Sequence, residues 1–181
     1  MPIQTPICDF GKKAISFELK STDEKILKLD DIKGENGTLI MFICNHCPYV
    51  IHYHDEIKRL ANDFDNTINM VAISSNDIEE YPQDGPDKMR ELWVRLGLSF
   101  PYLFDSTQDV AKQYKAECTP EFYLFDSSQK LVYRGRLDES SPNSGLEPTG
   151  EDLRNAIENV LNNKDVNADQ FPSMGCNIKW K

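Results

Sequence analysis

Two cysteines separated by two residues are the clearest chemical signal in this chain. Cys44 is the last residue of an apolar run, residues 38–44, that is typical of a buried strand, and Cys47 follows three residues later. After Pro48, apolar residues recur at helical spacing as far as Phe64. The first turn of a helix has unpaired N–H groups and the positive end of the helix dipole, which stabilise a thiolate. The sequence therefore predicts a dithiol/disulfide redox site where a strand meets a helix.

The other three cysteines do not complete a disulfide framework, because five cysteines at irregular spacings leave one unpaired. We expect Cys8, in an irregular N-terminal segment, to be an ordinary thiol. Cys118 is either a third redox partner or a small buried residue. Cys176, in a tail without periodicity, is either an additional resolving thiol or inert. In a reducing compartment such cysteines are more often catalytic or redox-active than structural.

Length and charge limit the classes of partner. The 181 residues suffice for one core, so we expect a single domain over 1–181. A formal net charge of −10 argues against nucleic acid or an anionic membrane surface as partner, since both require clustered Lys and Arg. The N-terminus lacks a signal-peptide pattern and the apolar runs are strand-sized, which predicts a cytoplasmic protein without a membrane span.

Hydrophobic patterning predicts strands that alternate with helices and then a closing hairpin and helix. The expected strands are 14–19, 38–44, 68–74, 100–104 and the hairpin 121–125 with 130–134. A helical turn is expected near 29–32, and longer helices over 48–64, 87–96, 107–115 and 149–161. From about residue 164 we expect an irregular tail. This order predicts an α/β sheet covered on both faces, with one antiparallel edge.

Four segments carry a family resemblance, and together they extend over nearly the whole chain. They are Phe42-Ile-Cys-Asn-His-Cys-Pro-Tyr, Cys118-Thr-Pro, Tyr133-Arg-Gly-Arg and the ending Pro172-Ser-Met-Gly-Cys-Asn-Ile-Lys-Trp-Lys. The chain resembles the thioredoxin-like superfamily and, within it, AhpC/TSA-type bacterial proteins of the peroxiredoxin-like branch. The resemblance implies a central mixed sheet with helices on both faces, an N-terminal β-hairpin extension and an inserted helix.

The resemblance also implies an activity, a thiol–disulfide oxidoreductase that needs no cofactor. Cys44 matches the nucleophile, at the more exposed end of the motif, and Cys47 matches the buried resolving thiol. Thr119 and Pro120 match the residues that face the dithiol across a cis peptide bond, where a substrate backbone can pair. The implied partners are protein or small-molecule disulfides and thiols, with a separate reductant or oxidant.

Two positions depart from the thioredoxin pattern. Thr38 stands where thioredoxins have a buried acid, so proton transfer from Cys47 requires another base or water. His46 stands between the cysteines, where a histidine is typical of oxidising members of the superfamily. We expect His46 to hydrogen-bond to the Cys44 thiolate or stabilise its charge and so to raise the redox potential; the alternative is a solvent-facing loop side chain.

Two other functions stay open. In a peroxiredoxin-like thiol peroxidase, Cys47 would be the peroxidatic cysteine, with Arg134 or Arg136 polarising the peroxide. Against this, Cys44 occupies the position where peroxiredoxins carry a hydroxyl. In a metal-binding module, Cys44 and Cys47 would hold zinc or copper together with Cys118 or a histidine. A single Cys-x-x-Cys provides only two of the four ligands that zinc requires, so we expect no metal.

Overall fold

The structure is a computed structural model that describes residues 2–6 and 9–181, so that Cys8 lies outside the described residues. Its strands are β1 (Pro2–Gln4), β2 (Glu18–Ser21), β3 (Ile26–Lys28), β4 (Gly37–Phe42), β5 (Asn69–Ser74), β6 (Tyr102–Phe104), β7 (Cys118–Thr119), β8 (Glu121–Asp126), β9 (Leu131–Gly135) and β10 (Met174–Asn177). Its α-helices are α1 (Leu29–Ile32), α2 (Pro48–His52), α3 (His54–Asp63), α4 (Pro86–Leu96), α5 (Asp109–Gln113) and α6 (Glu151–Leu161). A short 3-10 helix, η1, covers Pro82–Asp84.

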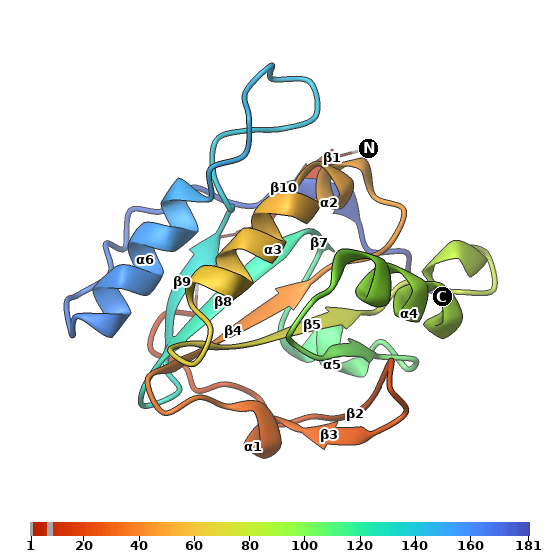
Figure 1. Ribbon diagram of the computed structural model, residues 1–181, viewed down its shortest axis with the longest axis horizontal. Coiled ribbons are helices and arrows are strands. Elements are labelled where there is room, and N and C mark those ends of the chain that lie inside the picture. The colour runs from red at the N-terminus through yellow and green to blue at the C-terminus, as the bar shows by residue number, and fades with distance from the viewer. Residues whose placement is uncertain (1, 7–8) are drawn as a thin grey trace.

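Seven strands form the main sheet, in the order β3-β2-β6-β5-β4-β8-β9 (Figure 1). The central pairs β4–β5 and β5–β6 are parallel, whereas β8 pairs with β4 in the antiparallel direction. This mixed sheet confirms the predicted α/β class. Antiparallel strands flank both sides rather than one edge, because the hairpin β2–β3 joins the sheet along β6.

Strand β4 is buried on both faces, which explains its unbroken apolar run. Leu39 and Met41 contribute to a core that also contains buried residues of α3, α4 and α6. Ile40 and Phe42 contribute to a second core on the other face, with buried residues of α1 and α5. Successive side chains of a strand point to opposite faces, so one hydrophobic strand serves both cores. This packing holds the end of β4 rigidly, and the two cysteines come shortly after that end.

Two predicted elements have different bounds. The strand expected over 14–19 begins only at Glu18, because the Tyr114 hydroxyl bonds to both the N–H and the carbonyl of Ile15 at 2.9 and 2.6 Å. The helix expected over 48–64 is two helices, α2 and α3. They meet at Tyr53, whose N–H donates to Val50 three residues back, at 3.0 Å.

The tail predicted as irregular contains β10, the central strand of a second, three-stranded sheet in the order β1-β10-β7. Its sequence, Met-Gly-Cys-Asn, has no alternation that would predict a strand. The pairing places β10 beside α2 and β7 (Figure 1). No helix within residues 2–6 and 9–181 has the length and apolar character needed to cross a membrane.

Candidate active site

A proline determines where the helix after the dithiol begins. A residue before proline is disfavoured in the α region, and Cys47 accordingly has φ −67° and ψ 123°. Cys47 is therefore the N-cap residue of α2, and Pro48 occupies the first helical position, where its missing N–H costs nothing. The N–H of Val50, in the first turn, is near enough to the Cys47 sulfur to help lower its pKa. The predicted position of the thiols at a strand-to-helix junction is confirmed.

Thr119 contacts both thiols from the opposite side of the site. The Thr119–Pro120 bond is cis, as predicted. The Thr119 hydroxyl lies 3.3 Å from the Cys44 sulfur, and the thiol of Cys47 donates to the Thr119 carbonyl at 3.2 Å. The structure therefore brings Cys44, Cys47, Thr119 and Pro120 into one cluster.

Both thiols are buried, with 1% of Cys44 and none of Cys47 exposed. The expectation that Cys44 lies at a more exposed end of the motif is wrong for this conformation, because Thr119 and the segment around Asp84 cover it. The next residues, Asn45 and His46, are partly exposed. A substrate disulfide can therefore reach the sulfur of Cys44 only after a local movement.

The two thiols have opposite pKa shifts. The hydrogen bond from Cys44, together with donors from Cys176 and the N–H of Val50, outweighs burial and lowers the pKa of Cys47 to about 5. The same Cys44–Cys47 hydrogen bond, burial and the charge of Asp84 raise the pKa of Cys44 well above its ordinary value. The Cys47 thiolate thus accepts hydrogen bonds from several donors. When Cys47 is protonated, its thiol instead donates a hydrogen bond to the Thr119 carbonyl. In the reduced site at neutral pH, the negative charge belongs to Cys47.

These shifts predict the titration of the reduced protein. Its ultraviolet thiolate absorbance should rise through a midpoint near pH 5, since Cys47 is thiolate above its pKa of about 5 and thiol below it. Cys47→Ser should remove this transition. Cys44→Ala, which removes the strongest donor, should move the midpoint upward by more than Cys44→Ser, which keeps a hydroxyl. A wild-type midpoint near the ordinary cysteine value of 9.0 would contradict this account.

A buried carboxylate that sequence analysis missed holds the Cys44–Cys47 loop. Asp84, in η1, is completely buried. One of its oxygens accepts the N–H groups of Asn45 and His46 at 2.8 and 3.2 Å. The other lies 2.5 Å from Nδ1 of His46 and accepts the Asn76 amide at 2.8 Å. Asp84 thus provides a buried acid beside Cys44, although from a different element than thioredoxins use.

Thr38, at the position where thioredoxins have that acid, is remote from this chemistry. Its hydroxyl accepts the N–H of Gly34 and donates to Gln129, both at 2.9 Å. It lies at the beginning of β4, whereas Cys44 follows the end of that strand. The prediction that another group must replace this acid is consistent with the position of Asp84.

His46 is fixed on Asp84 rather than on the thiolate. Its ring stacks on Tyr81, with centroids 5.5 Å apart and planes 8° apart. Among the described contacts, none is a hydrogen bond from His46 to Cys44, although ligand atoms of Cys44, His46 and Asp84 all lie within 4.8 Å of one another. His46 therefore lies near Cys44 without a described hydrogen bond to it, and its influence on the redox potential stays a prediction.

The same three residues are the group that could hold a metal ion within the described part of the chain. This differs from the predicted set, since Cys118 is not a member. Asp84 and His46 already bond to each other at 2.5 Å, and Asp84 also accepts two backbone N–H groups. A metal would have to replace the His46–Asp84 hydrogen bond, so the arrangement is better satisfied without one.

Cys118 and Cys176 have different environments. Cys118 is fully buried, and its thiol lies 3.7 Å from the carbonyl of Pro120. Burial and the charge of Glu121 raise the pKa of Cys118, which favours an inert thiol. Cys176, in β10, packs against the core around the dithiol and hydrogen-bonds to Cys47.

Neither arginine considered for peroxide chemistry contacts a described cysteine directly. Arg134 is almost fully buried and pairs with Glu121 at 2.8 Å. Arg136 pairs with Asp152 at 2.6 Å and lies over the ring of Phe171, 4.1 Å from its centroid. Both therefore have structural partners in this conformation.

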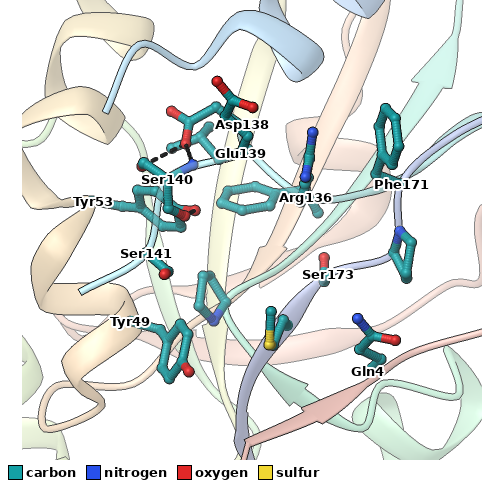
Figure 2. Close-up of a pocket in the computed structure, with 15 residues that line it drawn as sticks. Gln4, Tyr49, Tyr53, Arg136, Asp138, Glu139, Ser140, Ser141, Phe171 and Ser173 are labelled. Carbon is teal, nitrogen blue, oxygen red and sulfur yellow. Dashed lines mark hydrogen bonds between the residues drawn. The ribbon is translucent and has the colours of Figure 1, made fainter. Parts of the chain in front are cut away.

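Arg136 lines a hollow of about 140 Å³ beside Pro120 (Figure 2). Tyr49, Tyr53, Ser140 and Ser141 lie on one side of it, and Gln4, Phe171 and Ser173 on the other. No described cysteine lines the hollow. Pro120 belongs to both the hollow and the dithiol site, but the hollow does not open onto the sulfurs of Cys44 and Cys47.

The sequence profile of the AhpC/TSA family matches residues 10–134, which include the dithiol, Thr119 and Pro120. A search of the curated proteins gave no match. Among solved structures, an uncharacterized conserved protein from Geobacillus kaustophilus is 48% identical, with a TM-score of 0.97 over 100% of this chain and 97% of that one.

More distant structures share the fold alone. A secreted Mycobacterium tuberculosis disulfide oxidoreductase homologous to E. coli DsbE is 12% identical, with a TM-score of 0.61 over 78% of this chain and 94% of that one. The peroxidoxin BcpB from M. tuberculosis is 15% identical, with a TM-score of 0.63 over 86% of this chain and 97% of that one. The fold is therefore thioredoxin-like.

Proposed function

The chain belongs to the AhpC/TSA family of thioredoxin-like proteins, and on that premise we propose that it is a thiol–disulfide oxidoreductase with Cys44 and Cys47 as its redox pair. The observation that carries the proposal is the contact of both sulfurs with each other and with Thr119, at the N-terminus of α2. The substrates are protein or small-molecule disulfides, and a separate thiol or disulfide partner returns the site to its starting state.

The reaction begins with a proton transfer inside the pair. Cys44 passes its proton along the shared hydrogen bond to the Cys47 thiolate, whose thiol form then donates to the Thr119 carbonyl. The Cys44 thiolate is a strong nucleophile, because Asp84 and burial disfavour its charge. It attacks one sulfur of the substrate disulfide, and the other sulfur leaves as a thiolate.

The second step closes the ring. Cys47 loses its proton and attacks the sulfur of Cys44, which releases the second substrate thiolate and leaves a Cys44–Cys47 disulfide. Two electrons pass from the dithiol to the substrate. The single thiol proton of the reduced pair passes to one product thiolate, and the other product thiolate takes its proton from solvent. Run in reverse, the same steps donate a disulfide. The donors around Cys47 favour its thiolate again when the pair is reduced.

The hydrogen-bond donors around Cys47 also bear on the redox potential of the Cys44–Cys47 pair. Groups that stabilise a thiolate favour the reduced form, so we expect a potential above that of thioredoxin, which is roughly −270 mV. Equilibration with glutathione buffers, followed by mass spectrometry of the peptides, measures both the potential and the pairing. A value at or below that of thioredoxin would contradict the prediction, and absence of a Cys44–Cys47 disulfide would exclude the proposed function.

A thiol peroxidase is the second candidate, favoured by the low pKa of Cys47 at the N-terminus of α2. In that reaction the Cys47 thiolate attacks one oxygen of hydrogen peroxide, the O–O bond breaks, hydroxide leaves and Cys47 becomes a sulfenic acid. The Cys44 thiol then attacks the Cys47 sulfur, and water leaves as the disulfide forms. The pairing of Arg134 with Glu121, and a thiol at position 44 in place of a hydroxyl, weaken this candidate.

A further inference from the structure

The chain's own C-terminal strand occupies the edge on which a substrate strand was expected. Strand β10 pairs with β7 in the antiparallel direction, with Cys176 opposite Thr119 and Asn177 opposite Cys118. Extended peptides commonly bind by adding a strand to such an edge. Here the added strand belongs to the protein itself, and the residue that it places opposite Thr119 is a cysteine.

The strand is built to lie unusually close to Thr119. A Cβ atom on Gly175 would lie 2.0 Å from the Thr119 carbonyl oxygen, so only glycine fits without a backbone shift. The segments before and after β10 are also anchored. The Ser173 hydroxyl donates to the Gly135 carbonyl at 2.6 Å, and the N–H of Ile178 donates to the Glu117 carbonyl at 2.9 Å.

This placement brings a third sulfur to the dithiol. Cys176 lies opposite Thr119, whose carbonyl accepts the Cys47 thiol at 3.2 Å, and it packs against the core that contains both thiols of the dithiol. The thiol and the backbone N–H of Cys176 both help to lower the pKa of Cys47. Burial and the bond to Cys47 raise the pKa of Cys176 to about 12. Part of that shift exists only while Cys47 is reduced, since a Cys47 sulfur within a disulfide carries no charge. Oxidation of Cys47 therefore makes Cys176 easier to deprotonate.

We infer that Cys176 is a third redox-active thiol, which exchanges with the Cys44–Cys47 disulfide to form a Cys47–Cys176 disulfide. This inference rests on the proposed function for the first disulfide. The Cys176 thiolate attacks the sulfur of Cys47, the Cys44–Cys47 bond breaks, and Cys44 leaves as a thiolate that takes up the proton lost by Cys176. The exchange moves one disulfide bond and requires no further oxidant or reductant.

The exchange has a structural consequence. A Cys47–Cys176 bond ties β10 to the N-terminus of α2 and keeps the Thr119 edge covered, while Cys44 becomes a free thiol again. The reverse exchange removes this covalent tie and leaves β10 held only by its strand pairing and its flanking hydrogen bonds, as in the reduced structure. Cys176 thus couples the redox state of the dithiol to the availability of the edge for a substrate strand.

The test uses Cys44→Ser, in which only the second pairing remains possible at this site. The reduced variant is treated with glutathione disulfide, and its disulfides are mapped by mass spectrometry of unreduced peptides. We expect a Cys47–Cys176 disulfide in most molecules. In the matched Cys44→Ser/Cys176→Ser variant, Cys47 should keep glutathione as a mixed disulfide. A Cys44→Ser protein that keeps glutathione on Cys47, or pairs Cys47 with Cys8 or Cys118, would overturn the inference.

Gly175→Ala provides an independent test, because it shifts β10, and Cys176 with it, without removing any sulfur. In the Cys44→Ser background it should slow closure of the Cys47–Cys176 disulfide at least tenfold, with folding checked by circular dichroism. An unchanged rate in a folded protein would also count against the inference. Wild-type protein run in parallel separates the two claims. A Cys44–Cys47 disulfide there, without Cys47–Cys176 in the variant, refutes only the inference, whereas a wild-type protein that forms neither disulfide refutes the proposed function.

Discussion

Cys44→Ser should abolish disulfide reduction, and Cys47→Ser should stop the reaction half-way. Without Cys44 only the fully buried Cys47 remains of the pair, and a protein disulfide reaches it far less easily than glutathione disulfide does. The rate of insulin disulfide reduction should therefore fall on the order of 1,000-fold or more. Without Cys47 the first attack still occurs, but the mixed disulfide cannot be resolved by the adjacent thiol. Cys47→Ser should therefore accumulate Cys44 joined to substrate, which gel electrophoresis without reductant detects.

Cys118→Ser is the matched control for both variants. Cys118 is buried two residues before Pro120, and nothing in the proposed reaction uses it. Its loss should leave the rate of insulin reduction nearly unchanged. A thiol peroxidase would give a different pattern in the same variants. If peroxide consumption survives Cys44→Ser and disappears in Cys47→Ser, Cys47 is the peroxidatic nucleophile and the thiol peroxidase replaces the oxidoreductase.

The parts of the site that the sequence predicted are those determined by local rules. A buried strand, two cysteines, a proline and a helical pattern follow one another along the chain, and each constrains the next. Pro48 alone excludes Cys47 from the helix and makes it the N-cap residue. The α/β alternation was predicted from the order of elements, whereas the cis bond before Pro120 was predicted from the family resemblance.

The missed parts depend on contacts between distant residues. Asp84 lies in a polar loop without periodicity, 38 residues from His46, and only the fold brings its carboxylate to the Cys44–Cys47 loop. Strand β10 was missed because its pairing with Thr119 depends on the absence of a side chain at Gly175. Nothing in the local sequence distinguishes that glycine from an ordinary turn residue. In both cases the signal is a fit between surfaces that are formed only after folding.

Asp84→Ala should destabilise the reduced protein by about 3 kcal/mol or more. The change removes the acceptor for the N–H groups of Asn45 and His46 and for the Asn76 amide. Buried donors left without partners cost about 1–3 kcal/mol each, and breaking a buried pair is similarly costly. Urea unfolding of the reduced protein measures the loss, with Asp109→Ala, an exposed aspartate in α5, as the control.

Asp84→Asn separates the structural effect from the electrostatic one. The asparagine oxygen can still accept the N–H groups of Asn45 and His46, so the loss of stability should be smaller than for alanine. The charge beside Cys44 is removed, however, and the pKa of Cys44 should fall because Asp84 is one of the groups that raise it. Because the pair carries one negative charge when reduced and none as a disulfide, loss of the neighbouring carboxylate charge favours the reduced form, and the redox potential measured against glutathione should rise. A potential unchanged or lowered in Asp84→Asn would show that the Asp84 carboxylate holds the loop without acting on the thiols.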